Sequence, residues 1–207
     1  MTGSSKLNLR VTKFLVSLSS LRSPVKVRQV GDPVLQCIAQ PVDKEFIQTR
    51  EFKKVTDLMV KTMRINKGVG IAAPQIGESL QIFAMEFSEK HLHAIRKRGI
   101  KEEVLQTMEM SVFPLKIFVN PEFKVIDPKI IEFPEGCMSI PGFKGIVPRY
   151  RGVELEAMDE NGEEVTWKAY GWPARIIQHE VDHLNGTLYI KKMNPETFEN
   201  LYWKLNA

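Results

Sequence analysis

Two histidines with a glutamate between them form the part of this chain best suited to chemistry. Residues 179–183 read His-Glu-Val-Asp-His, so His179 and His183 are four positions apart. On a helix, side chains with this spacing lie on the same face, one turn apart. Two imidazoles in this arrangement can bind one metal ion, and Glu180 then lies where a general base acts on water. The alternative is a hydrogen-bonded histidine pair buried in a core helix.

The third metal ligand is not settled by this motif. A catalytic zinc-type site normally has three protein ligands and one open position. The spacing of a metzincin requires a histidine at position 189, which is Tyr189. A gluzincin takes a glutamate from a later helix, and Glu196 and Glu199 are candidates. The two cysteines, Cys37 and Cys137, are the remaining option.

The residues around the histidine pair predict the helix that carries it. Pro173 is typical of a first helical turn, and Gly186 is typical of a helix end. Ile177, Val181 and Leu184 form an apolar stripe on a different face from the histidines. We therefore expect the helix to pack against the core through this stripe.

A glycine-rich segment at residues 68–75, Gly-Val-Gly-Ile-Ala-Ala-Pro-Gln, superficially matches a dinucleotide-binding fingerprint. That fingerprint needs a strand before it and a helix after it. Here a helical pattern precedes the segment, Pro74 interrupts any following helix, and residues 80–85 predict a strand. We expect a loop whose glycines let a peptide ligand approach the backbone, with Gln75 as an amide donor. An ordinary glycine loop with Gln75 at the surface is the alternative.

Length and composition are those of an ordinary globular protein. The 207 residues suffice for one domain with a hydrophobic core. Two cysteines without a framework of spacings argue against a disulfide-stapled secreted protein. No apolar run is long enough to span a bilayer. The net charge of +4 comes partly from the N-terminal segment. We therefore expect neither a membrane span nor a specific nucleic-acid partner.

The first 25 residues have the composition of a leader. They are rich in serine, contain basic residues and lack acidic residues, and the first acidic residue of the chain is Asp32. This amphipathic, acid-poor composition is typical of a mitochondrial transit peptide, with a disordered tail as the alternative. We therefore divide the chain into a leader at residues 1–25 and one folded domain at residues 26–207.

Hydrophobic periodicity in the rest of the chain predicts an α+β fold. Residues 51–67 have helical spacing, and the charged stretch 88–112 predicts a solvated helix or loop insertion. Strands are predicted between turn signals, at residues 115–119, 123–125, 130–133, 153–157 and 165–169. A turn is expected at Asp127-Pro128, a hairpin at Asn161-Gly162, and a last helix from Asn194-Pro195. We expect antiparallel sheets packed around the central metal-binding helix.

Three motifs stand in one order along the chain and together resemble the three signature motifs of peptide deformylase. They are G-x-G-x-A-A-x-Q at residues 68–75, Glu-Gly-Cys-x-Ser at residues 135–139, and His-Glu-x-x-His at residues 179–183. The resemblance runs from about residue 28 to the C-terminus. It is strongest to the animal mitochondrial form of the family, which agrees with the leader-like N-terminus.

The resemblance implies a specific set of metal ligands and a catalytic acid/base. Cys137, His179 and His183 would bind one divalent ion, and Glu180 would move the proton. A cysteine thiolate is a soft ligand, and we expect Fe(II), with Zn(II) and Co(II) as alternatives. Arg149 and Asp182 are expected either to form an ion pair that joins the motifs or to remain separate surface charges.

The resemblance also implies oxyanion donors and a peptide site. The Gln75 side chain and the backbone N–H of Met138 would donate to the substrate oxygen, and the Gly70 backbone would contact the substrate chain. The pocket for the first substrate side chain would be formed by Phe133, Trp172, Arg175 and Ile176. Bacterial members usually have leucine in place of Met138 and an apolar residue in place of Arg175.

The activity that the resemblance implies is removal of the formyl group from N-formylmethionyl peptides, with release of formate. The partners would be newly made chains in the mitochondrial matrix, met during co-translational N-terminal processing, with transient ribosome contact. Two other functions remain as alternatives. One is an endopeptidase that uses Glu199 as its third ligand, and the other is an inactive, metal-bearing module that binds nascent chains or the ribosome.

Overall fold

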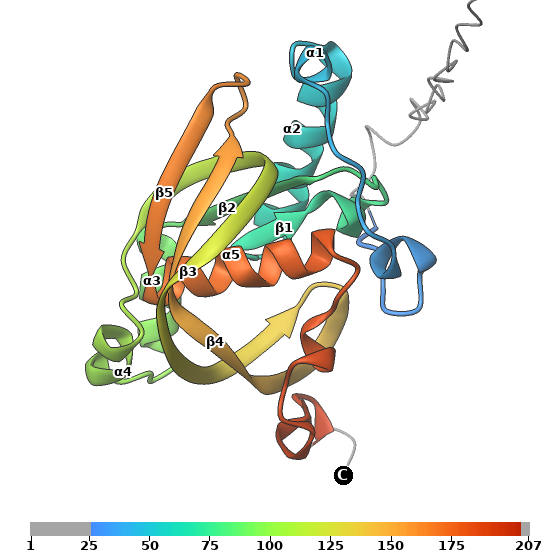
Figure 1. Cartoon of the computed structure of the whole chain (residues 1–207). Helices are drawn as coiled ribbons and strands as arrows, with labels where there is room; N and C mark the ends of the chain where they lie inside the picture. Colours follow the sequence, from blue (N-terminus) through green and yellow to red (C-terminus); the bar gives the residue numbers. More distant parts are fainter. Residues whose placement is uncertain (1–25, 204–207) are drawn as a thin grey trace, which may run out of the picture.

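The computed structural model describes residues 26–203, which form an α+β fold as predicted (Figure 1). The expected leader, residues 1–25, lies outside the described residues, as do residues 204–207. Strands β1 to β5 pair in chain order and are all antiparallel. Their bounds are Gly70–Ala72 for β1, Ile82–Phe87 for β2, Phe113–Cys137 for β3, Ile140–Met158 for β4 and Glu164–Tyr170 for β5.

The helices flank this sheet. They are α1 at Lys44–Ile47, α2 at Arg50–Ile65, α3 at Glu89–Lys97, α4 at Glu102–Thr107 and α5 at Gly171–Leu184. Helix α2 begins after Thr49, whose hydroxyl accepts a hydrogen bond from the N–H of Phe52 and so caps the helix. Helices α3 and α4 occupy the charged stretch for which a solvated helix was one expectation. No helix within residues 26–203 is long and apolar enough to cross a bilayer.

Strand β3 corrects one prediction, because no turn forms at Asp127-Pro128. The strand continues through the proline, and its pairing with β4 shifts register on both sides of Asp127. Proline cannot donate to a sheet ladder, so such an irregularity is where a strand tolerates it. A Cβ at Gly152 on β4 would meet the Asp127 side chain at 2.9 Å, so glycine permits the close approach. The β3–β4 pair therefore stays continuous and bends around α5 (Figure 1).

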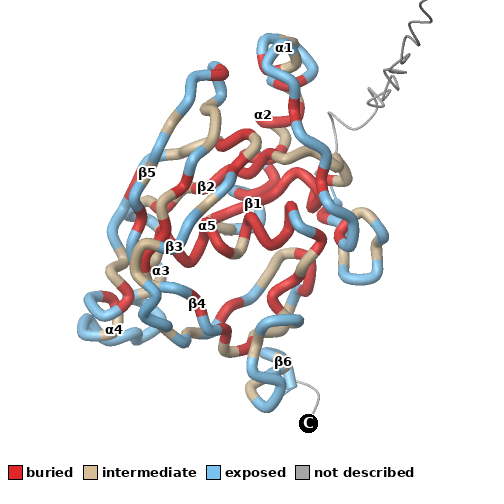
Figure 2. Tube along the Cα trace, in the orientation of Figure 1, coloured by how far each residue is buried: buried red, intermediate tan, exposed pale blue. Residues whose placement is uncertain are grey.

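Helix α5 forms the centre of the molecule. It runs across the inside of the bent sheet and contacts β1, β2, β4 and β5 (Figure 1). Twelve of its fourteen residues are buried, and Figure 2 shows the burial along most of its length. The predicted apolar stripe of Ile177, Val181 and Leu184 packs in the largest hydrophobic cluster. Because buried polar groups need partners, the polar residues of this helix must be satisfied by the elements around it.

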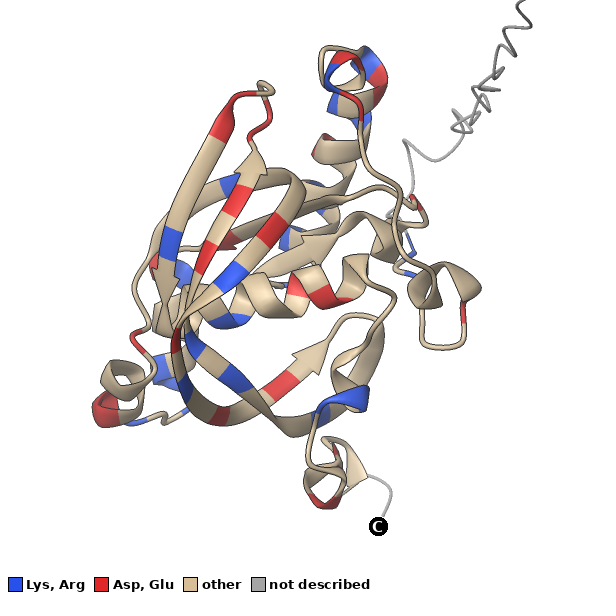
Figure 3. Cartoon of the chain, viewed as in Figure 1, with Lys and Arg blue, Asp and Glu red and all other residues tan. Residues whose placement is uncertain are grey.

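The outer face of the sheet carries alternating charges on neighbouring strands (Figure 3). Glu154 on β4 pairs in register with Lys124 on β3 and with Lys168 on β5. The nitrogen–oxygen distances are 2.7 Å and 3.4 Å, respectively. Opposite charges on adjacent strands support the register of an antiparallel sheet. The predicted hairpin at Asn161-Gly162 joins β4 to β5 and is confirmed, with Gly162 at φ +84°.

The C-terminal segment corrects a second prediction, because residues 194–203 do not form an α-helix. A short 3-10 turn at Pro195–Thr197 follows Asn194, and β6 at Glu199–Asn200 then pairs with β4. The Phe198 ring stacks on Phe143 with 4.9 Å between ring centroids. These contacts with the β3–β4 hairpin region outweigh the local helix preference.

Candidate metal centre and active site

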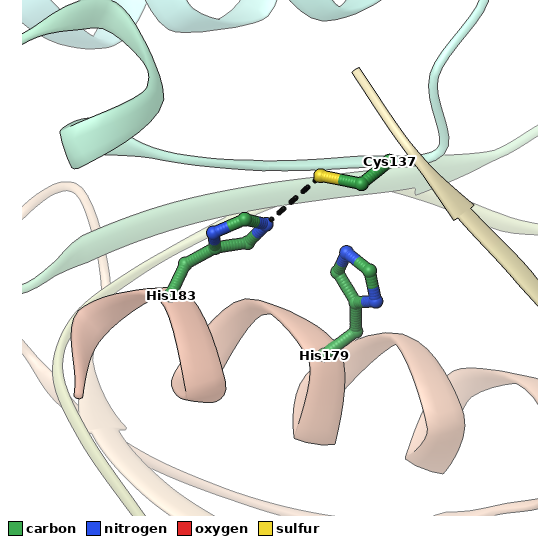
Figure 4. A group of neighbouring side chains, drawn as sticks. All are labelled: Cys137, His179 and His183. Atoms are coloured by element: carbon green, nitrogen blue, oxygen red, sulfur yellow. Dashed lines mark hydrogen bonds between the residues drawn. The ribbon is translucent and has the colours of Figure 1, made fainter. Parts of the chain in front are cut away.

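The structure brings Cys137, His179 and His183 together (Figure 4). Cys137 is the last residue of β3, and the two histidines project from one face of α5. Their ligand atoms all lie within 4.8 Å of one another. Cys137 Sγ is 3.3 Å from Nε2 of His183. The geometry therefore offers a third ligand from sulfur.

The other candidates for the third ligand lie elsewhere among residues 26–203. Glu199 is on β6 and pairs with Lys144 at 3.0 Å, and Glu196 is exposed in the preceding turn. Cys37 is exposed and is not part of the ligand cluster. Tyr189, at the metzincin position, is buried and stacks on His179 with 6.3 Å between ring centroids. It therefore supports the imidazole by packing.

The tight turn between β3 and β4 holds the Cys137 sulfur among hydrogen-bond donors. The N–H of Ser139 and Nε2 of Gln75 each approach Sγ at 3.4 Å. Burial by itself would raise the pKa of the Cys137 thiol, but His183 and His179 together lower it well below its ordinary value. The cysteine is therefore set up as a thiolate, which is the form that binds metals.

His179 is oriented by a carboxylate. Its Nδ1 lies 2.9 Å from Oε2 of Glu135. Burial alone would lower the pKa of His179, but its hydrogen bonds with Cys137 and Glu135 raise it well above its ordinary value. Carboxylate partners of this kind fix the tautomer and ring angle of metal-binding histidines.

The residues fit a divalent metal ion. One thiolate and two imidazoles are a donor set of catalytic zinc and iron sites, with a fourth position for water or substrate. In addition, Nδ1 of His183 and Oε2 of Glu180 are buried without a hydrogen-bond partner in the described structure. Buried polar atoms normally have partners, and an ion with its water beside them would provide one for Glu180.

Glu180 is buried next to the three ligands, with 3% of its surface exposed. Burial raises the pKa of this carboxyl group to about 7, although His179 and His183 act against the rise. A group that titrates near neutrality can both accept and return a proton. Gly70 on β1 makes room for it, because a Cβ at Gly70 would lie 2.3 Å from Oε1 of Glu180.

Gln75 lies in the 3-10 turn Ala73–Ile76 that follows β1, and it is buried, so the surface alternative is wrong. Its Oε1 accepts a hydrogen bond from the N–H of Ala72 at 2.9 Å. This fixes the amide so that Nε2 faces the Cys137 sulfur and Oγ of Ser139, the latter at 3.2 Å. The amide nitrogen therefore points towards the metal centre.

The N-terminal segment 28–30 joins the two loops that carry Gln75 and Met138. The N–H of Arg28 donates to the carbonyl of Gln75, and the N–H of Val30 donates to the carbonyl of Ser139, both at 2.8 Å. The Gln29 side chain donates to the carbonyl of Met138 at 3.2 Å. Hydrogen bonds from segment 28–30 thus fix the position of the Gln75 loop relative to the Met138 loop.

Of the four residues expected around the substrate pocket, Phe133, Trp172 and Ile176 make apolar contacts, whereas Arg175 also makes polar ones. The rings of Phe133 and Trp172 meet edge to face, with centroids 6.0 Å apart. Ile176 is buried in the main hydrophobic cluster. The Arg175 guanidinium lies 5.9 Å from the centre of the Phe133 ring, but its Nη1 donates a hydrogen bond to Glu135. Phe133, Trp172 and Arg175 are therefore neighbours, and Arg175 has additional polar partners.

Glu135 is the functional residue that the sequence reasoning left without a role. Its carboxylate accepts hydrogen bonds from Arg149, Arg175 and His179. The available signal was its place in the Glu-Gly-Cys-x-Ser motif, two residues before Cys137, although the pairing of β3 with β4 is irregular between these two residues. The expected ion pair between Arg149 and Asp182 is formed at 2.5 Å and is buried, so the alternative of separate surface charges is wrong.

The bent antiparallel sheet encloses a His-Glu-x-x-His helix with a cysteine and a buried glutamate beside the histidines, which is the arrangement of a metal-dependent hydrolase. The family model for polypeptide deformylase matches residues 24–199. The chain belongs to the peptide deformylase family. It is therefore a deformylase enzyme, which removes the N-formyl group from newly made polypeptides.

Named relatives agree with this family. The chain is 45% identical over 177 residues to "Peptide deformylase, mitochondrial" from Homo sapiens, covering 86% of this chain and 71% of the relative. It is 39% identical over 191 residues to "Peptide deformylase 1A, chloroplastic/mitochondrial" from Arabidopsis thaliana, covering 91% and 69%. A solved structure of the Acinetobacter baumannii class I type b enzyme with Met-Ala-Ser bound has a TM-score of 0.71 at 29% identity, covering 83% of this chain and 99% of that one.

Proposed function

We propose that this chain deformylates the N-terminal formylmethionine of polypeptides made in mitochondria, that it acts in the matrix, and that formate is released. The observation that carries the proposal is the convergence of Cys137, His179 and His183 beside the buried Glu180. The name of the human relative and the leader-like composition of residues 1–25 support the location. The division into a leader at 1–25 and one domain at 26–207 belongs to the same proposal, and the family match over residues 24–199 supports a single domain across most of the second part.

Cys137, His179 and His183 would hold one divalent ion, and we propose Fe(II), with Zn(II) and Co(II) as alternatives. The single soft thiolate beside two imidazoles supports this choice. When bound, such an ion supplies Lewis acidity, which polarises a carbonyl oxygen and lowers the pKa of water from about 15.7 towards 7.

Glu180 transfers the proton, and Gln75 and the N–H of Met138 stabilise the negative charge on the formyl oxygen. Glu180 accepts a proton from the attacking water as the water oxygen bonds to the formyl carbon. It then gives this proton to the departing nitrogen as the carbon–nitrogen bond breaks, which leaves formate and a free amine. Nε2 of Gln75 and the N–H of Met138 donate to the formyl oxygen as negative charge develops on it. Losing one such donor typically costs about 2.7–4 kcal/mol of transition-state stabilisation.

The substrate chain is proposed to lie along β1. This strand is at one end of the strand order, so its outer backbone edge can pair with an extended peptide. Gly70 on this strand would contact the peptide through its backbone, and its missing side chain leaves the space that Glu180 occupies. The first substrate side chain is proposed to enter a pocket formed by Phe133, Trp172, Arg175 and Ile176. The Met-Ala-Ser complex of the A. baumannii relative supports a linear peptide ligand. Transient ribosome contact belongs to the same proposal.

The central test is formate release from formyl-Met-Ala-Ser by the Fe(II)-loaded chain, with acetyl-Met-Ala-Ser as the substrate control. Glu180→Gln should retain the metal, because Glu180 is not a ligand, and should lose about 100- to 10,000-fold in kcat. Glu199→Gln is the matched control and should keep both metal and turnover. Near-normal turnover of Glu180→Gln would refute the proton-transfer role. Metal loss in Glu199→Gln would favour the endopeptidase alternative.

Two further outcomes bear on function and location. If no metal form released formate while formyl-Met-Ala-Ser still bound, the alternative of an inactive binding module would replace the enzyme. Removal of residues 1–25 should leave formate release unchanged and abolish import into isolated mitochondria. Unimpaired import of the shortened chain would contradict the transit-peptide proposal.

A further inference from the structure

Arg175 has more polar partners than a pocket wall requires. It lies in α5, one turn before His179, and only 3% of it is exposed. Its Nη1 donates to Oε1 of Glu135 at 2.7 Å and to the carbonyl of Val147 at 3.0 Å. Its Nη2 donates to the carbonyl of Ile131 at 2.5 Å. A buried arginine with three acceptors is held in one position, so the groups that it contacts indicate its role.

The acceptor that matters for the metal centre is Glu135. Its Oε1 accepts from Nε of Arg149 at 2.9 Å and from Arg175. Its Oε2 accepts from Nη2 of Arg149 and from Nδ1 of His179, both at 2.9 Å. An ionised carboxylate offers about four lone-pair sites, and these four contacts use them. The carboxylate therefore cannot rotate without breaking contacts, and His179 meets a fixed acceptor.

The three partners of Arg175 also join the elements that carry the metal ligands. Ile131 and Glu135 are on β3, which ends at Cys137, whereas Val147 is on the neighbouring β4. Arg175 itself is on α5, which carries His179 and His183. One guanidinium thus connects the strand of the sulfur ligand to the helix of the nitrogen ligands.

We propose that Arg175 is a positioning residue for the metal centre. It holds Glu135 in place at the junction of α5, β3 and β4, and Glu135 in turn keeps Nε2 of His179 directed at Cys137 and His183. This proposal rests on the proposed metal site and adds to it a residue that does not touch the metal. Arg149 still binds Glu135 through two hydrogen bonds when Arg175 is replaced, so the site forms but is held less firmly.

A role in positioning and a role as a pocket wall predict different measurements. If Arg175 positions Glu135, its replacement weakens metal binding and lowers kcat, in addition to any change in KM that comes from its place in the pocket wall. If Arg175 acts only on the substrate side chain beside Phe133, its replacement changes KM and side-chain preference, while metal affinity stays unchanged. Metal affinity therefore separates the two roles.

The experiment uses the Co(II)-loaded full chain and follows the loss of Co(II)–thiolate absorption to a competing chelator. Arg175→Met should weaken Co(II) affinity about 10- to 100-fold, which is the usual effect of removing a partner of a metal-binding histidine. Arg175→Lys should fall between wild type and Arg175→Met, because an ammonium keeps one charged donor for Glu135 but cannot reach all three acceptors. If Arg175→Met fails to fold, the Co(II) affinity of Arg175→Lys tests the proposal in its place.

Arg151→Met is the matched control. Arg151 is on β4 and binds Glu109 and Asp127, away from the ligand cluster. It should leave Co(II) affinity unchanged. Affinity of both Arg175 variants within about twofold of wild type would overturn the proposal, because partners of metal-binding histidines have larger effects. Since the chelator assay needs no substrate, a wild-type chain that binds Co(II) but releases no formate would refute the proposed function without affecting this test.

Discussion

Two arginines on β4, only two positions apart, form networks of similar geometry in different surroundings. Arg149 binds Glu135 and Asp182 at 2.9 Å and 2.5 Å. Arg151 binds Glu109 and Asp127 at 2.5 Å and 2.6 Å. The side chain of Arg149 is 3% exposed, whereas that of Arg151 is 33% exposed. The nitrogen–oxygen distances are similar in the two networks, but the arginine side chain is buried in one and partly exposed in the other.

The difference shows where an ion pair has structural consequences. Removing one member of a buried pair leaves an uncompensated charge, which is strongly unfavourable. Water and salt screen an exposed pair, so its contribution to stability is small. Arg149 joins β4 to α5 beneath the metal ligands, whereas Arg151 joins β4 to the segment after α4. We therefore expect only the Arg149 network to affect folding and the metal site together.

The largest effect is expected for Arg149→Met. It leaves Glu135 and Asp182 buried with fewer positive partners, and breaking a buried pair typically costs about 3–5 kcal/mol. We expect a loss of this size in the free energy of unfolding, measured by urea denaturation with saturating metal. Arg149→Lys should recover part of it because it retains the charge. A loss no greater than that of Arg151→Met would contradict the contrast between the networks.

Glu135→Gln should weaken both the fold and metal binding, because Glu135 is also the charged partner of the buried Arg149 and Arg175. The amide keeps the shape of the side chain but removes the negative charge that faces His179. We expect metal affinity to fall about 10- to 100-fold, measured by competition with a chelator. Glu109→Gln makes the same change in the exposed network and should leave metal affinity unchanged. Equal affinities for the two variants would remove the functional distinction between the networks.

The smallest effect is expected for Arg151→Met, and it should depend on pH and salt. The hydrogen bond with Arg151 is the main cause of the lowered pKa of Asp127. A carboxyl group with a lowered folded-state pKa stabilises the fold above its ordinary value of 3.8, and this contribution disappears as pH falls through the folded value. The stability difference between wild type and variant should therefore shrink below pH 3.8 and in high salt. A difference that grows in acid would contradict this account.

The part of the site that could be predicted from sequence is the part encoded locally. The spacing of His179 and His183, with Pro173 and Gly186 at the helix ends, predicts both the helix and the shared face. The spacing alone did not select Cys137, which is far away in the sequence. It reaches the histidines only because the β3–β4 pair bends around α5. The choice of cysteine over glutamate therefore came from the family resemblance.

The wrong predictions have a related cause. Asp127-Pro128 is a strong local turn signal, but pairing with β4 on both sides keeps the strand continuous. Asn194-Pro195 is a plausible helix start, but the free edge of β4 and the Phe143 ring give the following residues other partners. Strand preferences depend on neighbouring strands, which a local pattern does not contain. The role of Glu135 was missed for a similar reason, because its four hydrogen bonds come from three residues on two other elements, β4 and α5.

The segment 28–30 places a limit on how this chain can be matured. Its backbone and the Gln29 amide connect the turn of Gln75 to the turn of Met138 and Ser139. A protease that removes a leader must therefore cut before Arg28. A cut beyond Val30 would keep the proposed metal ligands and Glu180 in the chain, yet would release the link between the two proposed oxyanion donors. The hydrogen bonds of segment 28–30 therefore set the furthest position at which the proposed leader could be removed.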